Sequence, residues 1–286
     1  MTVQLGILLA LACALATNLG FLCKHRGACA APDVDWRHPI LSAAGLFRSR
    51  WFTLGMLVAV GAWLLHVAAL SVAPLSLVQA VISGGLVLLA VFAERVFGLE
   101  VGTRQWLGIG LTALGLVLLA ATLPSAADAD ASYSVAAMIA FEAGLLCVGT
   151  LLLLSHRLGA PRQHHALLLG AAAGVLFGVS DVAIKALTAA VADSGSLGLL
   201  SPWLAPCVVA SVVAFYASAR GLQKGDAVPV ITLTSVSANV SAISGGLVVY
   251  GDAPSDPLGI VLQGVAFLLV IVAAALMPAP LRLATS

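Results

Sequence analysis

Two acidic residues, Glu142 and Asp181, lie inside long apolar stretches of this chain, where a charge is unfavourable. A charged side chain at the centre of a bilayer costs about 2.5–3.5 kcal/mol on insertion scales, so each acid needs a partner or a function. Lys185 follows Asp181 by four residues and shares its helix face, which allows either an internal ion pair or a cation or proton site that exchanges partners. Glu142 has no Lys or Arg within a turn, so it is either a protonated carboxyl that couples proton movement or a neutral one bonded to a neighbouring helix. We predict that Asp181, Glu142 and Lys185 form an ion-coupling set.

Membrane-spanning helices must position these residues. The chain has 286 residues, of which 61% are hydrophobic and 9% are charged. Apolar stretches of about 20 residues recur, the length with which an α-helix crosses ~30 Å of hydrocarbon. Because backbone polar groups in lipid must bond within their own segment, we predict an all-α integral membrane protein that forms one membrane domain over residues 1–286. The stretches number nine, at about 3–23, 51–72, 75–97, 104–123, 132–154, 166–190, 203–221, 227–249 and 258–277.

The basic residues indicate the orientation of these helices. Twelve of the 13 Lys and Arg residues lie in every second gap between the apolar stretches, and Lys185 is the exception. Positively charged loops stay on the cytoplasmic side, which places the N-terminus outside and the C-terminus inside. An odd number of crossings also requires the termini to lie on opposite faces. We therefore predict a multi-pass protein of the plasma (inner) membrane.

The gap lengths and two short matches predict an internal repeat. Lys24 ends the first helix as Lys185 lies near the end of the sixth, and Leu107-Gly108-Ile109 matches Leu258-Gly259-Ile260 at the start of the last helix of each unit. Four crossings return the chain to its starting face, so one linking helix between the units inverts the second relative to the first. Inverted repeats are common in secondary transporters. The predicted units are about 1–124 and 164–280, joined by a linking helix at about 131–155.

Polar residues within the helices are candidates for substrate binding. Asn239 lies near the middle of the eighth helix on a stripe of Ser and Thr, and Asn18 is its weaker analogue in the first helix. His66 and Tyr216 occupy matching positions in the two repeats, so both can line a cavity between the halves, where such transporters bind their substrates. Close helix packing or a buried histidine bonded to the backbone is the alternative explanation. We predict that Asn239, His66, Tyr216 and Asn18 bind the substrate.

Several segments resemble the drug/metabolite transporter superfamily. They are Ala69-Leu70 followed by Ala-Pro-Leu-Ser-Leu-Val at 73–78, Glu94-Arg95 at the end of a long apolar helix, and Trp106-Leu107-Gly108 at the start of a Gly-rich one. The part of the first helix at 18–28 resembles the Lys-Lys-Gly region of the NIPA-type magnesium transporter branch. The resemblance implies a membrane carrier with a pseudo-two-fold axis in the membrane plane. Nine helices depart from the ten of the EamA-like majority and are closer to the NIPA-like branch, or to a fused pair of four-helix units of the small-multidrug-resistance type.

These observations favour a secondary transporter of a small molecule that works by alternating access. Two alternatives are open: a NIPA-like magnesium transporter, and a non-transporting, lipid-handling membrane subunit whose long basic first loop contacts anionic head groups. The chain has no paired nucleophile and base, zinc motif or phosphate loop, so we expect no enzyme, no catalytic residue, no cofactor and no metal motif. The net charge of +1 gives no reason to expect nucleic acid as a partner. The expected partners are an ion or small-molecule substrate and the lipid bilayer, and a homodimer is left open.

Overall fold

A computed structural model of the chain describes residues 2–70, 81–82, 84–122, 133–251 and 257–276. All regular structure in these ranges is helical, which confirms the predicted all-α class. The motif at 73–78, the predicted outer gap at 124–131 and most of the gap at 250–257 lie outside the described residues.

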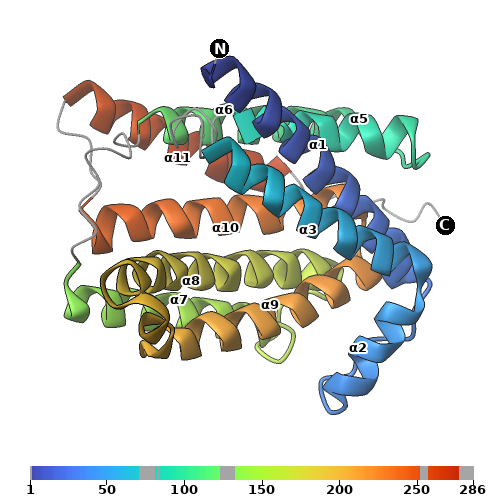
Figure 1. Ribbon diagram of the computed structural model, residues 1–286. Helices are drawn as coiled ribbons and strands as arrows, with labels where there is room; N and C mark the ends of the chain where they lie inside the picture. Colours follow the sequence, from blue (N-terminus) through green and yellow to red (C-terminus); the bar gives the residue numbers. More distant parts are fainter. Residues whose placement is uncertain (1, 71–80, 83, 123–132, 252–256, 277–286) are drawn as a thin grey trace.

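The helices follow the apolar stretches in order along the chain (Figure 1). In the described part of the chain, each predicted stretch contains a helix, although a continuous helix is described only for the second half of 75–97. An additional helix, α2, lies in the first gap, and 3₁₀ helices flank α8 at Arg162–His164 and Gly195–Leu200. The bounds are α1 Thr2–Cys29, α2 Pro39–Arg48, α3 Arg50–Leu70, α5 Leu86–Arg95, α6 Thr103–Ala121, α7 Val135–Leu153, α8 His165–Ser194, α9 Leu204–Lys224, α10 Ala227–Val249 and α11 Pro257–Leu276.

Five of the described helices are long and apolar enough to cross a membrane. They are α1, α7, α8, α9 and α10, and shorter apolar runs occur in α3 at Arg50–His66 and in α11 at Pro257–Val270. Large apolar side chains cover the outside of the bundle, as expected where helices face lipid; Leu57 on α3, for example, is 65% exposed. The chain is therefore a multi-pass membrane protein, while the count of nine crossings and the orientation stay predictions.

Close contact between backbones joins α8 to α10. Gly170, Gly174 and Gly178 recur every four residues and line the face of α8 that meets α10. A Cβ atom on Gly174 would lie 2.7 Å from the Cβ of Ser237, and one on Gly170 would lie 2.9 Å from the carbonyl oxygen of Val230. Small residues at such crossings allow helix backbones to approach closely in lipid. Figure 1 shows α8 and α10 side by side along their length.

Equivalent helices of the two predicted halves make similar contacts. α1 packs against α3 in the first half as α8 packs against α9 in the second, and α6 and α11 pack against each other. At the contact between α1 and α3, a Cβ atom on Gly20 would lie 3.2 Å from the carbonyl oxygen of Gly55. Two related halves would produce such contacts, and the inverted repeat itself stays a prediction.

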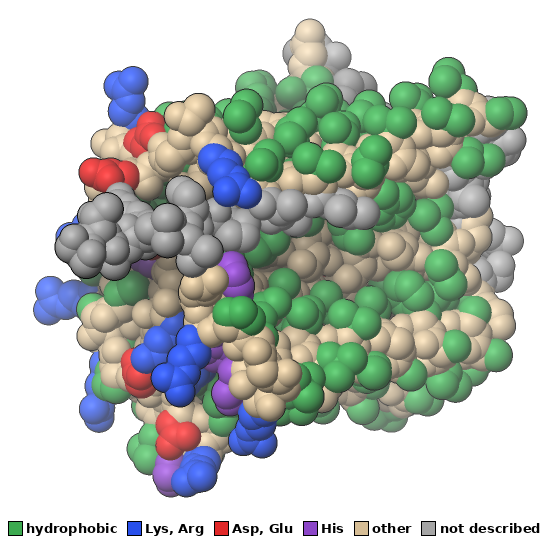
Figure 2. Space-filling view, turned by 180° about the vertical axis from the view of Figure 1, so that it is seen from behind, with side chains coloured by type: hydrophobic (Ala, Val, Ile, Leu, Met, Phe, Trp, Pro, Cys, Tyr) green, Lys and Arg blue, Asp and Glu red, His purple; other side chains and the backbone are tan. Residues whose placement is uncertain are grey.

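Lys and Arg side chains gather at one end of the face seen in Figure 2, whereas hydrophobic side chains recur over the rest of that face. The connection between α1 and α3 lies at this basic end (Figure 1). The sequence predicts only a loop there, and the structure corrects that expectation because Pro39–Arg48 forms α2. Pro39 occupies the first turn of α2, where its missing N–H would have no partner within the helix. Ser42 and Leu46 form the buried side of α2, which packs against α3.

Candidate functional site

A cavity of about 280 Å³ lies between α1, α8 and α10. Three predicted site residues line it, namely Asn18 on α1, Asp181 on α8 and Asn239 on α10. Each lies close to the middle of its helix, so the cavity is near the centre of the bundle. The other lining residues are Ala14, Thr17, Phe21, Ile82, Phe177, Thr234, Ser235 and Ala238.

Asn18 is buried, and its amide orientation is fixed by backbone carbonyls. Its Nδ2 donates to the carbonyl oxygen of Ala14 at 2.9 Å and to that of Gly85 at 2.8 Å. Carbonyl oxygens only accept hydrogen bonds, so the nitrogen must face them. Gly85 directly precedes α5, so this bond joins α1 to the start of α5. With both amide hydrogens used, Asn18 has only its Oδ1 oxygen, an acceptor, left for a ligand.

Asn239 is held in a similar way by its own helix. Its Nδ2 donates to the carbonyl oxygen of Ser235 at 2.8 Å. This bond again fixes which side of the amide is nitrogen, and the Oδ1 oxygen of Asn239 has no donor among the described residues. Two helices therefore present amide oxygens at one cavity.

Asp181 adds a carboxyl group to these acceptors. Its side chain is exposed although it lies in the middle of α8, because it faces the cavity rather than a neighbouring helix. Among the described residues, none donates a hydrogen bond to this carboxyl group, and no Lys, Arg or His lines the cavity. The hydroxyl of Thr234 lies 3.0 Å from the carbonyl oxygen of Gly170 and 2.9 Å from that of Val230, so it points away from a ligand. The cavity is thus rich in oxygen acceptors.

Lys185 shares α8 with Asp181 but makes a contact elsewhere. Its ammonium lies 3.9 Å from the centre of the Tyr250 ring, and the Tyr250 hydroxyl donates to the carbonyl oxygen of Val182 at 3.1 Å. The rings of Tyr133 and Tyr250 are 5.7 Å apart. A cation over an aromatic ring is stabilised by the ring quadrupole. The predicted exchange of Asp181 between Lys185 and another cation stays a prediction.

Glu142 is buried in α7 and does not line the cavity. Its Oε1 atom has no hydrogen-bond partner among the described residues. Its neighbours along α7, Met138 and Phe141, belong to an apolar cluster with Val182 and Val249. Glu142 is therefore separate from the group formed by Asn18, Asp181 and Asn239.

The structure places the other two predicted substrate residues away from the cavity. His66 lies in α3, where its Nδ1 atom is buried without a partner in the described part of the chain. Tyr216 lies in α9, and its hydroxyl donates to the carbonyl oxygen of Pro39 at 2.8 Å. Its ring is 6.1 Å from that of Trp36. Tyr216 thus contacts the segment at the basic end rather than a central site.

Two aromatic residues of the cavity, Phe21 and Phe177, were not among the predicted site residues. Phe21 follows Asn18 by three residues, and Phe177 precedes Asp181 by four. Residues at these spacings share a helix face, so the spacing was the signal that could have identified both. The rings form apolar walls beside the oxygen acceptors.

A second cavity, of about 780 Å³, lies between the end of α1, the connection from α5 to α6 and the start of α10. His25, Glu100, Arg104 and Asp226 are its ionisable residues. Both predicted halves contribute to its walls. We call it the vestibule, because it lies along the same two helices, α1 and α10, as the central cavity.

A dedicated metal cluster is absent from the described residues, since no group of three or more His, Cys, Asp and Glu side chains could hold an ion there. An ion in the central cavity would meet one carboxyl group together with amide and hydroxyl oxygens. This set suits a hard cation that keeps part of its water shell.

The apolar helices and the polar cavity within them define the class of this chain as a multi-pass α-helical membrane transporter, and a comparison with known proteins supports the class. The chain is similar to a protein of Arabidopsis thaliana named "Probable magnesium transporter NIPA9". The two are 25% identical over 290 residues, which cover 97% of this chain and 83% of the relative. No protein-family model matches the chain. No solved structure matches it either.

Proposed function

We propose that the protein is a NIPA-like transporter that carries Mg²⁺ across the membrane by alternating access. Asn18, Asp181 and Asn239 bind the ion in the central cavity. The observation that carries this proposal is the hydrogen bonding of that cavity, whose amide nitrogens are tied to backbone carbonyls while its oxygens remain available. The similarity to the relative from Arabidopsis thaliana favours Mg²⁺ among the hard cations.

The size of the cavity fits a hydrated divalent cation. Mg²⁺ prefers six oxygen ligands, dehydrates reluctantly and is usually held by one or two carboxylates. A water molecule occupies about 30 Å³ of liquid, so an octahedral shell of six needs roughly 180 Å³. The cavity of about 280 Å³ has room for such a shell with Asp181 in contact. Weak, partly water-mediated binding also allows release on the other side of the membrane.

The vestibule supports a pathway for the ion from the basic end of the molecule. Its walls carry two carboxylates, Glu100 and Asp226, against one guanidinium, Arg104, and α1 and α10 lead from it to the central cavity. The central cavity lies between α1 of the first predicted half and α8 and α10 of the second, so a movement of one half against the other would change access to it. Transporters built from two related halves rock around a site near the membrane midplane.

Glu142 and Lys185 are assigned to coupling rather than to the ion itself. Glu142 is buried and has an unpartnered oxygen in the described part of the chain, so the gain or loss of its proton changes the stability of the surrounding packing. Lys185 holds a positive charge against Tyr250 on the same helix as Asp181. Both roles rest on the proposed transport of an ion.

Uptake of Mg²⁺ into liposomes that contain the purified protein tests the proposal, with an internal dye as the readout and with or without a pH gradient. Asp181→Asn should lower uptake at least about tenfold, which corresponds to 1.4 kcal/mol of lost ion binding. Glu94→Gln is the matched control, because Glu94 accepts a hydrogen bond from Trp106 outside the cavity. Equal uptake by the wild type, Asp181→Asn and Asn239→Leu would contradict the assignment of the site.

An organic cation is a second candidate substrate, favoured by Phe21 and Phe177 in the walls of the cavity. Aromatic faces attract quaternary ammonium groups through the ring quadrupole. Competition distinguishes the two substrates, since tetramethylammonium should block Mg²⁺ uptake only if both occupy the cavity. Uptake of the organic cation without any Mg²⁺ uptake would select the second candidate. A purified protein that moves neither solute would favour the lipid-handling alternative.

A further inference from the structure

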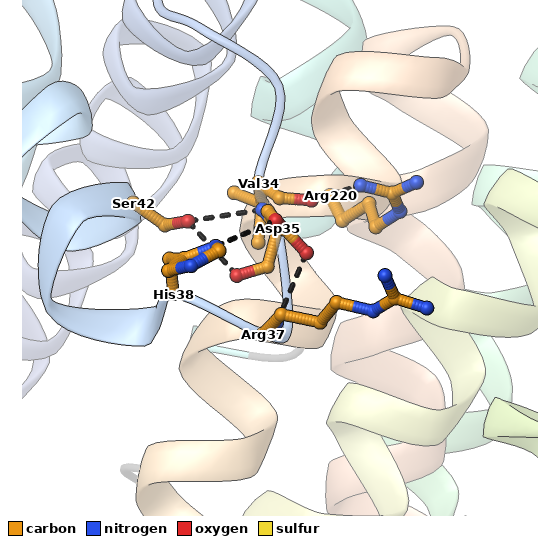
Figure 3. A network of polar contacts seen from close by, with 6 residues as sticks. All are labelled: Val34, Asp35, Arg37, His38, Ser42 and Arg220. Atoms are coloured by element: carbon orange, nitrogen blue, oxygen red, sulfur yellow. Dashed lines mark hydrogen bonds and ion pairs between the residues drawn. The ribbon is translucent and has the colours of Figure 1, made fainter.

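The segment between α1 and α3 is attached to the end of α9 by a series of polar contacts. Gln223 accepts a hydrogen bond from the backbone N–H of Val34 at 3.0 Å and donates to the carbonyl oxygen of Pro32 at 2.9 Å. The guanidinium of Arg220 donates to the carbonyl oxygen of Val34 (Figure 3). Lys224 pairs with Asp33 at 2.5 Å. These contacts fix the position of the chain just before α2.

A second set of contacts fixes the start of α2 itself. The backbone N–H of Asp35 donates to the hydroxyl of Ser42 at 2.9 Å, and that hydroxyl lies 3.1 Å from the carbonyl oxygen of Asp35. The Asp35 carboxylate accepts from the backbone N–H of Arg37 at 2.9 Å and lies 3.0 Å from Nδ1 of His38 (Figure 3). Both acids of this segment, Asp33 and Asp35, are therefore occupied by partners close to them in the structure.

The attachment places α2 at the depth of a membrane surface. Tyr216 bonds the carbonyl oxygen of Pro39 at the start of α2, and Tyr216 lies eight residues before Lys224, the last residue of α9. At 1.5 Å per residue, this contact is roughly 12 Å from the end of that membrane-spanning helix. Trp36 packs against Tyr216, and such aromatic rings prefer the boundary between lipid and water. α2 thus begins beside α9 rather than in the water beyond it.

The outer face of α2 is apolar, and basic side chains lie at its last residue and on the residues that flank it. Ile40 is 82% exposed and Leu41 is 70% exposed, and the exposure of such large apolar side chains to water is unfavourable. Arg37, Arg48 and Arg50 are exposed on the same segment. Among the described residues, no carboxylate lies within ion-pair distance of these three guanidinium groups. A helix with this pattern lies in the plane of a membrane surface, with its apolar side chains among the acyl chains.

We propose that α2 binds anionic phospholipid of the leaflet at the basic end of the molecule. Arg37, Arg48 and Arg50 contact the phosphate groups, while Ile40 and Leu41 insert among the acyl chains. Because the segment before α2 is bonded to α9, a lipid bound there stabilises the junction between the two predicted halves. This inference does not depend on which solute the protein carries.

Native mass spectrometry of the purified full-length protein tests the proposal by counting retained lipids after incubation with equal amounts of phosphatidylglycerol and phosphatidylcholine. The wild type should retain phosphatidylglycerol preferentially. A basic residue near an anionic surface contributes about 1 kcal/mol, so each of Arg37→Gln, Arg48→Gln and Arg50→Gln should reduce the preference about fivefold. The double variant Ile40→Ser, Leu41→Ser should lower retention of both lipids without a change in their ratio.

A matched control triple, Arg95→Gln, Arg157→Gln and Arg162→Gln, removes the same charge from other loops of the basic end. Its preference for phosphatidylglycerol should equal that of the wild type. The substitution of Lys for Arg at 37, 48 and 50 keeps the charge and should keep the preference for phosphatidylglycerol. A preference that is lost with Gln but kept with Lys is therefore due to the charge rather than to a loss of folding. The triple variant Arg37→Gln, Arg48→Gln, Arg50→Gln should lose most of the preference. An equal loss in the control triple, or no loss in the triple at 37, 48 and 50, would overturn the proposal. All these readings are independent of Mg²⁺ uptake.

Discussion

At the scale of single residues, hydrogen bonding to the backbone determines which polar atoms of the central cavity are available to a ligand. A free asparagine offers donors and an acceptor equally. Asn18 and Asn239 use their nitrogens on carbonyl oxygens of helices, so only their oxygens remain for the ligand. The preference for a cation therefore arises from how the amides are anchored as well as from the charge of Asp181.

The two asparagines should differ in their contribution to stability. Asn18 bonds the carbonyl oxygen of Gly85 on another segment, whereas Asn239 bonds only its own helix. Hydrogen bonds between helices in membranes contribute about 0.6 kcal/mol on average and at most about 1.7. Asn18→Leu should therefore lower the free energy of unfolding by about 0.6–1.7 kcal/mol, measured by thermal unfolding in detergent. Asn239→Leu is the control, and a larger loss there than at Asn18 would contradict this account.

The attachment of Asp33 to Lys224 should weaken in acid. Hydrogen bonding to Lys224 lowers the pKa of Asp33 in the folded protein. The pair therefore contributes fully above the ordinary carboxyl range, near about pH 4, and its contribution is lost as the pH falls through the lowered value. Amide hydrogen exchange of Val34, corrected for its intrinsic rate, should rise across this window.

Asp33→Asn should show faster exchange at neutral pH and less change in acid. The N–H of Arg37 and the side chain of His38 lower the pKa of Asp35 as well, so Asp35→Asn separates the two groups. Exchange at Val34 that is unaffected by either variant would show that Arg220 and Gln223 hold the segment alone.

At the scale of elements, the contact between α8 and α10 requires small side chains. A methyl group on Gly174 would collide with α10, and overpacking of this kind costs about 1–3 kcal/mol. Gly174→Ala should therefore lower the unfolding temperature and impair uptake. Gly144→Ala in α7 is the matched control, because nothing lies within 4 Å of a Cβ atom there. Similar unfolding temperatures for the two variants would show that α8 and α10 can move apart to accommodate the added methyl group without a loss of stability.

The sequence predicted the long elements well because their signal is length in apolar residues. Stretches such as 132–154 and 227–249 correspond to α7 and α10 with shifts of a few residues. α2 was not predicted because a helix of ten residues is too short to cross a membrane. It also lies in a gap between apolar stretches that is marked by basic residues. The extension of α1 to Cys29, beyond the expected end at 23, has the same cause, since Lys24 and Arg26 continue a helix that the apolar pattern no longer marks.

At the scale of the whole molecule, the orientation rests on the basic end seen in Figure 2. Single cysteines introduced as Arg157→Cys and Ser196→Cys, in a variant without the five native cysteines, test it by labelling with a membrane-impermeant maleimide. The N-out orientation predicts labelling of Ser196→Cys in intact cells and of Arg157→Cys only after permeabilisation. The reverse pattern would place the basic end outside.

The assembly of the site was beyond the sequence for a physical reason. Asn18, Asp181 and Asn239 are each recognisable as polar residues in apolar helices, but their meeting depends on how α1, α8 and α10 are rotated and shifted against one another. That register is set by contacts such as Gly174 with Ser237. Tyr216 shows the converse, because its partner lies in a segment whose structure the sequence did not indicate.

The bonds between the first connection and α9 have a consequence for synthesis. Lys224 and Asp33 are separated by 191 residues, and a ribosome adds about 5–20 residues per second, so Asp33 is made roughly 10–40 s before its partner. Throughout that interval, the 30–36 segment exists without the end of α9 to which it is bonded. These bonds can therefore form only after α9 has been inserted. In a nascent chain in which α9 fails to insert, the 30–36 segment has no partner and stays accessible to the chaperones and proteases that act on new membrane proteins.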